Sequence, residues 1–554
     1  MFSLAIAIGI YSYLIFFFGL LGLLTKENVT IVTVGWLAIL LFIEKKYIIL
    51  SFRKIKSVKF SLKSIFKNKL LSLLAVLIVL QALVNLIGAI GPELAFDALW
   101  YHLTLPKLYL LQHSIYHIPG GLLYYSDMPK LGEMLYTGAL GIGNEITAKI
   151  IHFLFGILIS IAIYKIARRI FSPLICLLAV VIFYSNLVVD WESTTAYIDL
   201  IRTFFETMSI WGLLNWFETK KVKWLIISAL MIGFAVTTKL LAFGTVLILS
   251  ILILIHYIDS RLRGNDKESV FHLFIRLFVY WLIVLLIPLP WFIFSFIHTG
   301  NPVFPFFTHN YEVTPEVFSV FGFFKEVWTL FTHASDPVSP IYLLFLPLLF
   351  FTFVKFKKEV KYLVVFSGIA IVVWYFTPRT GGGRFILPYL PAFSIIIAAI
   401  VEQITENKKR FGELLPKLLF TVIVFVSLIS LLYRGAANAK YVPVIFGMES
   451  KQTFLRNHLN FSFGDFYDTD NYFAKHITQN DRVLTFGFHN LYYIDFPFVD
   501  NSWVQRWNKF DYVAVQNSRL PARFKNWQLI YKNDKTLVQL YQPPKGVCPK
   551  ICAY

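Results

Sequence analysis

Long apolar runs separated by short polar segments make up the chain from Phe2 to Tyr433. Many runs are long enough for a helix to cross a hydrocarbon core of about 30 Å. The pattern predicts about thirteen membrane-spanning helices. We place them at residues 3–24, 29–44, 70–90, 146–167, 173–189, 196–217, 224–238, 241–258, 271–296, 341–355, 360–377, 386–404 and 416–433. The stretch from 224 to 258 is divided because Thr237, Thr238 and Lys239 indicate a turn within it.

The pattern changes in the tail that follows Tyr433. Strand-like runs at 481–488, 510–516, 527–532 and 537–541 follow a short helical segment at 472–478. A helix combined with short strands is typical of a small α/β domain. The expected fold is therefore an all-α polytopic membrane bundle with a small α/β domain at its C-terminus.

The chain divides into four parts on this pattern. They are two N-terminal transmembrane helices with a basic loop at 1–69, a transmembrane module at 70–296 with a first outer loop at 91–145, an outer loop with the last transmembrane helices at 297–433, and a soluble domain at 434–554. The first apolar run has no small-residue cleavage site before the next run begins. We therefore interpret it as a retained helix rather than a signal peptide.

Composition excludes a soluble globular protein. Hydrophobic residues are 57% of the chain and charged residues only 15%, against roughly a quarter in soluble domains. The net charge of +19 would suggest nucleic acid in a soluble protein, but here Lys and Arg concentrate in alternate loops between the apolar runs. The positive-inside rule makes those loops cytoplasmic. The N-terminus is then cytoplasmic, and the tail after Tyr433 is extracytoplasmic.

The first outer loop carries the most informative group of ionisable residues. Glu93, Asp97, His102 and Lys107 lie among apolar and aromatic residues directly after a predicted span. Ionisable groups at membrane level are costly and are candidates for function. Asp97 could be a general base, or it could cap an interfacial helix that begins near Leu99. A metal site formed by Glu93, Asp97 and His102 is a less favoured alternative.

Further charged residues lie near the outer ends of later spans. Asp199 and Arg202 are three residues apart, so they can share a helix face and pair. Asp190 and Glu192 are interpreted as solvated loop charges.

Five sequence segments resemble the GT-C superfamily of membrane glycosyltransferases. The resemblance is closest to the branch of protein O-mannosyltransferases and bacterial aminoarabinose-type transferases, and it covers most of 70–433. The segments are Phe96-Asp97-Ala-Leu-Trp-Tyr-His102, Tyr125-Ser-Asp127-Met-Pro129-Lys-Leu-Gly-Glu133, Ala196-Tyr-Ile-Asp199-Leu200, Thr238-Lys239 and Arg384-Phe-Ile-Leu-Pro388-Tyr-Leu-Pro391. Each motif is short, and their order, sidedness and loop lengths carry the resemblance.

The resemblance implies an inverting glycosyltransferase that takes a sugar from a polyprenyl-phosphate donor on the non-cytoplasmic face. Asp97 would be the base that deprotonates the acceptor, which is a lipid, a glycan or a protein. Lys239, Arg379 and Arg384 would bind the donor phosphate, and Gly381, Gly382 and Gly383 would let backbone N–H groups approach it. Asp127 is a further site candidate. No cofactor is expected, and a divalent metal stays the less favoured alternative. The expected location is the plasma (inner) membrane, and an ER membrane would give the same sidedness.

Three other classes of protein share parts of this pattern. A transporter or flippase for an anionic or lipid-linked substrate would also have many spans, but we find no internal repeat. A polysaccharide polymerase or ligase would use a late outer loop rich in basic residues, and 297–340 holds few. A non-catalytic assembly or receptor component is the third. Convergence of Asp97, Lys239 and Arg384 on one outward-opening cavity beside lipid would favour the transferase, and a central pore or a midplane pocket would favour the transporter.

Overall fold

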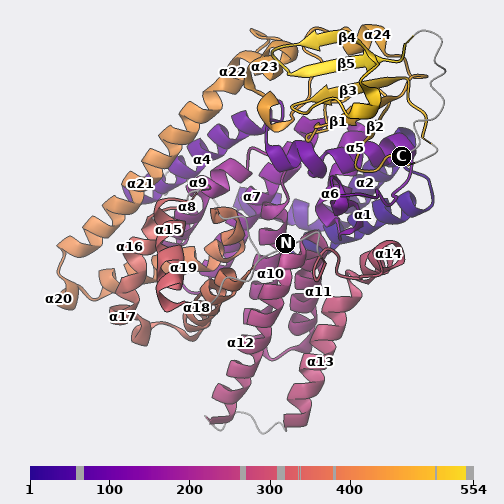
Figure 1. The fold of residues 1–554 in the computed structure, drawn as a ribbon. Coiled ribbons are helices and arrows are strands. Elements are labelled where there is room, and N and C mark those ends of the chain that lie inside the picture. The colour runs from indigo at the N-terminus through magenta and orange to yellow at the C-terminus, as the bar shows by residue number, and fades with distance from the viewer. Residues whose placement is uncertain are drawn as a thin grey trace.

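The computed structural model describes residues 1–57, 68–262, 270–308, 319–334, 336, 338–377, 382–505 and 508–544. Helices form the membrane part, and a small sheet caps one end of the molecule (Figure 1). The helices before residue 200 are α1 (Phe2–Leu20), α2 (Lys26–Ser57), α4 (Lys69–Ala89), α5 (Thr104–Gln112), α6 (Leu131–Ile142), α7 (Glu145–Ala167), α8 (Pro173–Tyr184), α9 (Leu187–Glu192) and α10 (Asp199–Thr219). The later helices of the bundle are α11 (Val222–Thr238), α12 (Phe243–Leu262), α13 (Val270–Leu286), α14 (Leu289–Thr299), α15 (Val320–Thr332), α16 (Ile341–Phe345), α17 (Leu349–Thr352), α18 (Lys358–Phe376), α19 (Leu390–Glu406), α20 (Lys408–Phe411) and α21 (Leu414–Asn438).

The described residues contain seven helices long and apolar enough to cross a membrane, or eight if the bent pair α13 and α14 forms one span. The membrane bundle is thus confirmed, but the count of about thirteen spans is not. The reason is that several predicted spans form shorter or more charged helices. α8 has 12 residues and α11 has 17, while α10 carries three charged residues within two turns.

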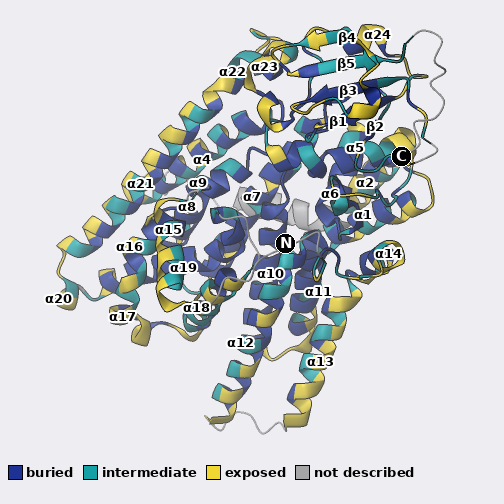
Figure 2. Cartoon of the chain, viewed as in Figure 1, coloured by how far each residue is buried: buried dark blue, intermediate teal, exposed yellow. Residues whose placement is uncertain are grey.

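The interior of the bundle is formed by α7, α10, α11 and α19. α10 packs against α7 and α11, and α19 packs against α8 and α18. Figure 2 shows the central helices mostly buried, whereas α13 turns exposed apolar residues outward. Exposed side chains on α13 include Phe271, Phe274 and Phe278. Such a surface is suited to hydrocarbon rather than water.

Local sequence sets the helix ends near the first outer loop and the α11 turn. Asn144 caps α7, since its side chain accepts a hydrogen bond from the Ile146 N–H at 3.0 Å. α11 ends at Thr238, and Lys239 is extended with φ −155° and ψ 123° before a short 3₁₀ turn at Leu240–Ala242. The predicted turn at Thr237–Lys239 is therefore present.

The tail forms the predicted α/β domain. Its elements are α22 (Val442–Ile445), α23 (Lys451–His458), α24 (Tyr472–His476), β1 (Val483–Phe486), β2 (Phe498–Asp500), β3 (Tyr512–Gln516), β4 (Gln528–Asn533) and β5 (Val538–Gln542). The strand order is β2-β1-β3-β5-β4, in which β1 is parallel to β2 and β3, and β5 is antiparallel to β3 and β4. The four predicted strands correspond to β1, β3, β4 and β5. The three-residue β2 was not predicted, because it is too short to show an alternating pattern.

The segment between β1 and β2 fixes the domain to the first outer loop. Lys107 Nζ donates to the carbonyl oxygens of Tyr492 at 2.8 Å and Ile494 at 2.7 Å, and to Asp495 Oδ1 at 2.8 Å. The Tyr493 hydroxyl donates to the carbonyl oxygen of Glu93 at 2.9 Å. These contacts place the domain directly over the loop that carries Asp97.

Candidate active site

Asp97 lies between α4 and a short π-helix at Ala98–His102, and it is only 8% exposed. Its carboxylate makes no capping hydrogen bond to that helix, so the capping role is wrong. Asp97 Oδ2 instead accepts hydrogen bonds from Arg384 Nη1 at 2.6 Å and from the Tyr101 hydroxyl at 3.3 Å. The backbone N–H of Asp97 donates to the Tyr197 hydroxyl at 3.1 Å. Asp97 is thus held in place with one carboxylate oxygen carrying both side-chain contacts.

Arg384 reaches Asp97 from the 3₁₀ turn at Gly383–Phe385 that precedes α19. Gly383 N–H donates to the Asp336 carbonyl oxygen at 2.9 Å, which fixes this turn against the segment between α15 and α16. The amide of Gly383 is therefore used internally rather than offered to an anion. Burial lowers the pKa of the Arg384 guanidinium, but Asp97 and Asp199 outweigh it and raise the pKa well above its usual value. Arg384 therefore stays charged.

Lys239 forms a second ion pair beside the first. Its Nζ lies 2.8 Å from Asp199 Oδ1 and 5.5 Å from the centre of the Phe385 ring. The Arg384 guanidinium lies 5.3 Å from the same ring. Both cations thus lie near the Phe385 ring, and the three predicted residues Asp97, Lys239 and Arg384 converge. They come from an outer loop, a break between α11 and α12, and the start of α19.

The expected pairing of Asp199 with Arg202 is wrong. Asp199 pairs with Lys239, and Arg202 turns along α10 to Glu206, with Nε 2.5 Å from Oε1. Residues four apart on a helix are well placed to pair, and Glu206 supplied that partner. Arg202 also donates to the Leu241 carbonyl oxygen at 3.4 Å, so it supports the 3₁₀ turn next to Lys239.

The interpretation of Asp190 and Glu192 as solvated charges is also wrong, since both are fully buried. α9 packs between α4 and α21, where Asp190 accepts from Asn85 at 3.1 Å and Ser430 at 3.0 Å. A six-residue helix shows no periodicity from which this burial could be predicted. Within the described part of the chain, neither carboxylate oxygen of Glu192 has a hydrogen-bond partner, although Oε2 lies 3.8 Å from His152 Nε2. Asp199 Oδ2 has no hydrogen-bond partner there either. An unpartnered Asp199 Oδ2, on a carboxylate whose other oxygen pairs with Lys239, indicates a polar site.

The remaining candidates in the first outer loop have structural partners. Glu93 accepts from the backbone N–H groups of Leu94 and Ala95, both at 2.8 Å, and of Ala196 at 2.6 Å. His102 Nδ1 lies 2.8 Å from Glu133 Oε1. Glu93, Asp97 and His102 thus have separate partners. Among the described residues, no group of three or more His, Cys, Asp or Glu side chains could hold a metal ion.

Two other candidates support neighbouring segments. Asp127 lies 2.9 Å from His117 Nδ1 and accepts from Ser126 at 3.1 Å. Lys107 holds the C-terminal domain, as described above. Arg379 and Gly381 lie outside the described residues, so their predicted roles stay predictions.

Several residues at this site were not singled out from the sequence. Tyr101, Tyr197 and Phe385 contact the charged groups, and they belong to the quoted segments but carry no charge that would mark them. His489 comes from the C-terminal domain, with its ring 4.8 Å from Phe96 and 4.3 Å from Trp100. No sequence signal connects His489 to residues almost four hundred positions earlier.

Comparisons with known proteins concern the fold and one part of the sequence. The family model described as dolichyl-phosphate-mannose-protein mannosyltransferase matches residues 120–299, which include Lys239 and Asp199 but neither Asp97 nor Arg384. No curated protein matches the sequence. Among solved structures, ArnT from Cupriavidus metallidurans in the apo state is similar with a TM-score of 0.55 and 12% identity, over 84% of this chain and 97% of that chain. ArnT from the same organism bound to undecaprenyl phosphate gives a TM-score of 0.54 and 12% identity, with the same coverage.

The apolar helices make the chain an integral membrane protein, and its fold is the GT-C fold of ArnT. Over residues 120–299 the chain is also similar to the protein mannosyltransferase family.

Proposed function

We propose that this protein is an inverting glycosyltransferase that moves a sugar from a polyprenyl-phosphate donor to an acceptor hydroxyl. The observation that carries the proposal is the convergence of a buried carboxylate, Asp97, with two cations, Arg384 and Lys239. The resemblance to a transferase family and to an ArnT structure that holds undecaprenyl phosphate supports the class of donor.

The reaction follows from the chemistry of these groups. The acceptor hydroxyl oxygen attacks the anomeric carbon, the bond from that carbon to the phosphate oxygen breaks, and the hydroxyl proton passes to the Asp97 carboxylate. A single displacement inverts the anomeric configuration. The leaving polyprenyl phosphate gains negative charge, which Arg384 and Lys239 are placed to balance. Arg384 has five N–H donors, so it can contact a phosphate and keep its contact with Asp97.

The rival classes fit these observations less well. A transporter would be expected to hold its charged residues near the middle of the membrane between repeated halves. Here the charged residues come from a loop and from the ends of helices, beside a domain that covers them. A polymerase or ligase would draw on the loop at 297–340, whereas Asp97, Lys239 and Arg384 come from other segments.

We further propose that the N-terminus is cytoplasmic and that the C-terminal domain lies outside the plasma membrane. Figure 1 supports this topology, because α20 and the far ends of α12 and α13 lie at the end of the bundle away from the sheet. α17 is also at this end, and Lys357 and Lys358 of the basic loops come a few residues after it in the sequence, where α18 begins. The active residues then lie on the face where lipid-linked rather than nucleotide-linked sugars are available.

No divalent metal is part of the proposal, because Arg384 and Lys239 supply positive charge and the donor carries a single phosphate. We expect that EDTA leaves the transfer rate of washed membranes within about twofold. A larger loss that Mg²⁺ or Mn²⁺ restores would show that a metal takes part.

The test of function uses Asp97→Asn in cells that lack the native gene. Mass spectrometry of lipid-linked and protein-linked glycans should show a sugar modification with the wild-type gene that is absent without it. We expect Asp97→Asn to lower transfer in isolated membranes by about 10²- to 10⁴-fold, the usual contribution of a general base. Asp534→Asn is the control, because Asp534 is exposed in the C-terminal domain. Full transfer by Asp97→Asn would refute the assigned base.

A further inference from the structure

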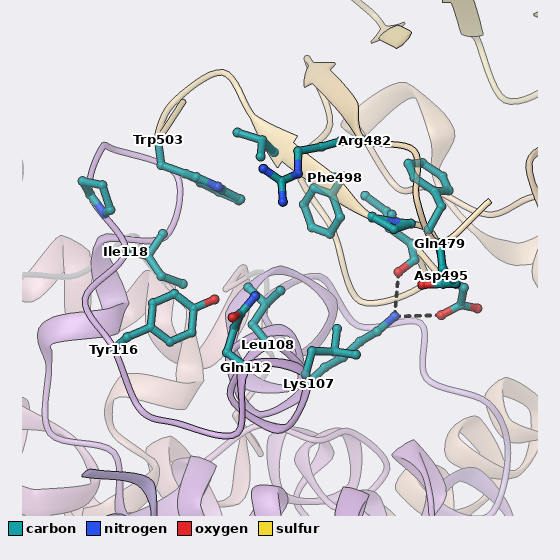
Figure 3. Close-up of a pocket in the computed structure, with 16 residues that line it drawn as sticks. Lys107, Leu108, Gln112, Tyr116, Ile118, Gln479, Arg482, Asp495, Phe498 and Trp503 are labelled. Carbon is teal, nitrogen blue, oxygen red and sulfur yellow. Dashed lines mark hydrogen bonds and ion pairs between the residues drawn. The ribbon is translucent and has the colours of Figure 1, made fainter. Parts of the chain in front are cut away.

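A cavity of about 480 Å³ lies between α5 and the C-terminal domain (Figure 3). One wall is formed by α5 and the loop that follows it, and the other by the loop before β1 together with β2 and its flanking loops. A cavity of this size is within the range of small-molecule sites. None of its lining residues was assigned to the reaction.

The two walls are joined at both ends of the cavity. Lys107 links them at one end through its three contacts to Tyr492, Ile494 and Asp495. At the other end Gly120, with φ +90°, lies so close to the Ser502 carbonyl that a Cβ there would be 1.8 Å from its oxygen. The cavity is therefore preformed, which lowers the entropic cost of binding a ligand.

Aromatic rings from three segments line the cavity. Tyr116 follows α5, Phe498 begins β2, and Trp503 follows β2 with its ring centre 6.1 Å from that of Phe498. Trp503 is positioned by its backbone N–H, which donates a hydrogen bond to the Asp500 carbonyl oxygen at 3.1 Å. In Figure 3 the Trp503 and Phe498 side chains point into the space between the walls. Aromatic faces carry partial negative charge and attract the C–H groups that a sugar ring presents on one face.

Planar polar side chains complete the lining. Gln112, Gln479 and Arg482 border the cavity, and their amide and guanidinium groups suit hydroxyl and carboxylate partners. Arg482 is anchored at its backbone, where its N–H donates to Asp511 Oδ2 at 3.0 Å. Its guanidinium has no hydrogen bond or ion pair to any described residue. Because Asp495 already pairs with Lys107, the charge left for a ligand is the positive charge of Arg482.

From this lining we infer that the cavity binds an acidic saccharide, with the sugar ring against Trp503 and Phe498 and its carboxylate on Arg482. The inference rests on the proposed function, since a saccharide here would be part of a glycan acceptor held by the C-terminal domain. A peptide that adds a strand beside β2 is the competing occupant. The three-residue length of β2 gives such a peptide few backbone partners, so the saccharide is favoured.

The test measures binding of two matched disaccharides to the full-length protein in lipid nanodiscs by saturation-transfer NMR, without donor. Cellobiuronic acid carries one carboxylate, and cellobiose is its neutral counterpart. We expect cellobiuronic acid to bind at least about tenfold more tightly than cellobiose, which corresponds to one charge-assisted contact.

Arg482→Ala should remove the preference for cellobiuronic acid, and Trp503→Ala should weaken the binding of both disaccharides. Gln479→Ala changes an exposed residue and so cannot disturb the core. It should weaken the binding of both disaccharides by a smaller factor than Trp503→Ala does. Arg456→Ala on α23 is the control, because it removes an exposed arginine of the same domain away from the cavity. The inference is overturned if neither disaccharide binds, if the variants bind as the wild type does, or if a strand-forming peptide binds in their place.

This test is separate from the test of the reaction. Disaccharide binding that persists in Asp97→Asn would support the cavity whatever happens to transfer. Transfer without any disaccharide binding would leave the proposed function intact and overturn the saccharide cavity.

Discussion

At the scale of single residues, Arg384 connects the two halves of the proposed chemistry. It contacts the proposed base, Asp97, and it lies beside Phe385 and the pair formed by Lys239 and Asp199. A guanidinium can contact two anions at once, whereas an ammonium acts as a point charge. The identity of this residue therefore matters as well as its charge.

We predict that Arg384→Ala weakens donor binding by about 10- to 150-fold, because a hydrogen bond to a charged group contributes about 1.5–3 kcal/mol. Arg384→Lys should recover only part of the loss. Affinity for undecaprenyl phosphate, which is the lipid phosphate of such a donor without its sugar, is measured in detergent micelles and checks both variants. Arg519→Ala, an exposed arginine in the C-terminal domain, is the control. Unchanged affinity in Arg384→Ala would remove its phosphate role.

The sequence marked some of these residues and not others. Asp97, Lys239 and Arg384 could be selected because charges are conspicuous among apolar runs. Their partners could not be selected, because the pair Asp97 and Arg384 joins positions 287 residues apart. The local rule that did apply, pairing along a helix, led to the wrong partner for Arg202.

At the scale of elements, the turn at Gly383–Phe385 positions Arg384. An added Cβ at Gly383 would lie 2.3 Å from the Asp336 carbonyl oxygen and 2.5 Å from Val338 Cγ2. The oxygen belongs to the backbone, so the clash cannot be relieved by a side-chain rotation. The glycine is therefore required by close packing rather than by anion binding.

Gly383→Ala should accordingly shift the turn, lower transfer by about tenfold or more, and destabilise the protein by about 1–3 kcal/mol. Thermal unfolding and transfer rate in membranes check this outcome. Gly368→Ala is a matched control, since no atom lies within 4 Å of its added Cβ in the middle of α18. Equal unfolding temperatures and equal transfer rates in the two variants would contradict the packing argument.

At the scale of the whole molecule, the C-terminal domain is held over the active residues by the segment between β1 and β2. Lys107 provides three contacts to this segment, and Lys451 adds an ion pair to Glu145. The residue chosen from the sequence as a site candidate thus connects two parts of the fold.

We expect Lys107→Ala to increase hydrogen exchange of the 489–495 backbone, with the opening free energy lowered by about 1.5–3 kcal/mol. Hydrogen exchange with mass spectrometry measures the change, and the strands of the sheet serve as an internal reference. Lys525→Ala, an exposed residue of the same domain, should leave this segment unchanged. Unaltered exchange in Lys107→Ala would mean that other contacts alone hold the domain.

The sequence by itself determined the membrane bundle, the α/β tail with four of its five strands, and the charged site candidates Asp97, Lys239 and Arg384. These properties follow from hydrophobic length, alternation and the high cost of a charge among apolar residues, all of which are local. Only the tertiary structure decided which charges meet, that Asp190 and Glu192 are buried, and that a domain and a cavity lie over the first outer loop. Those features depend on contacts between distant segments, and no local pattern encodes such contacts.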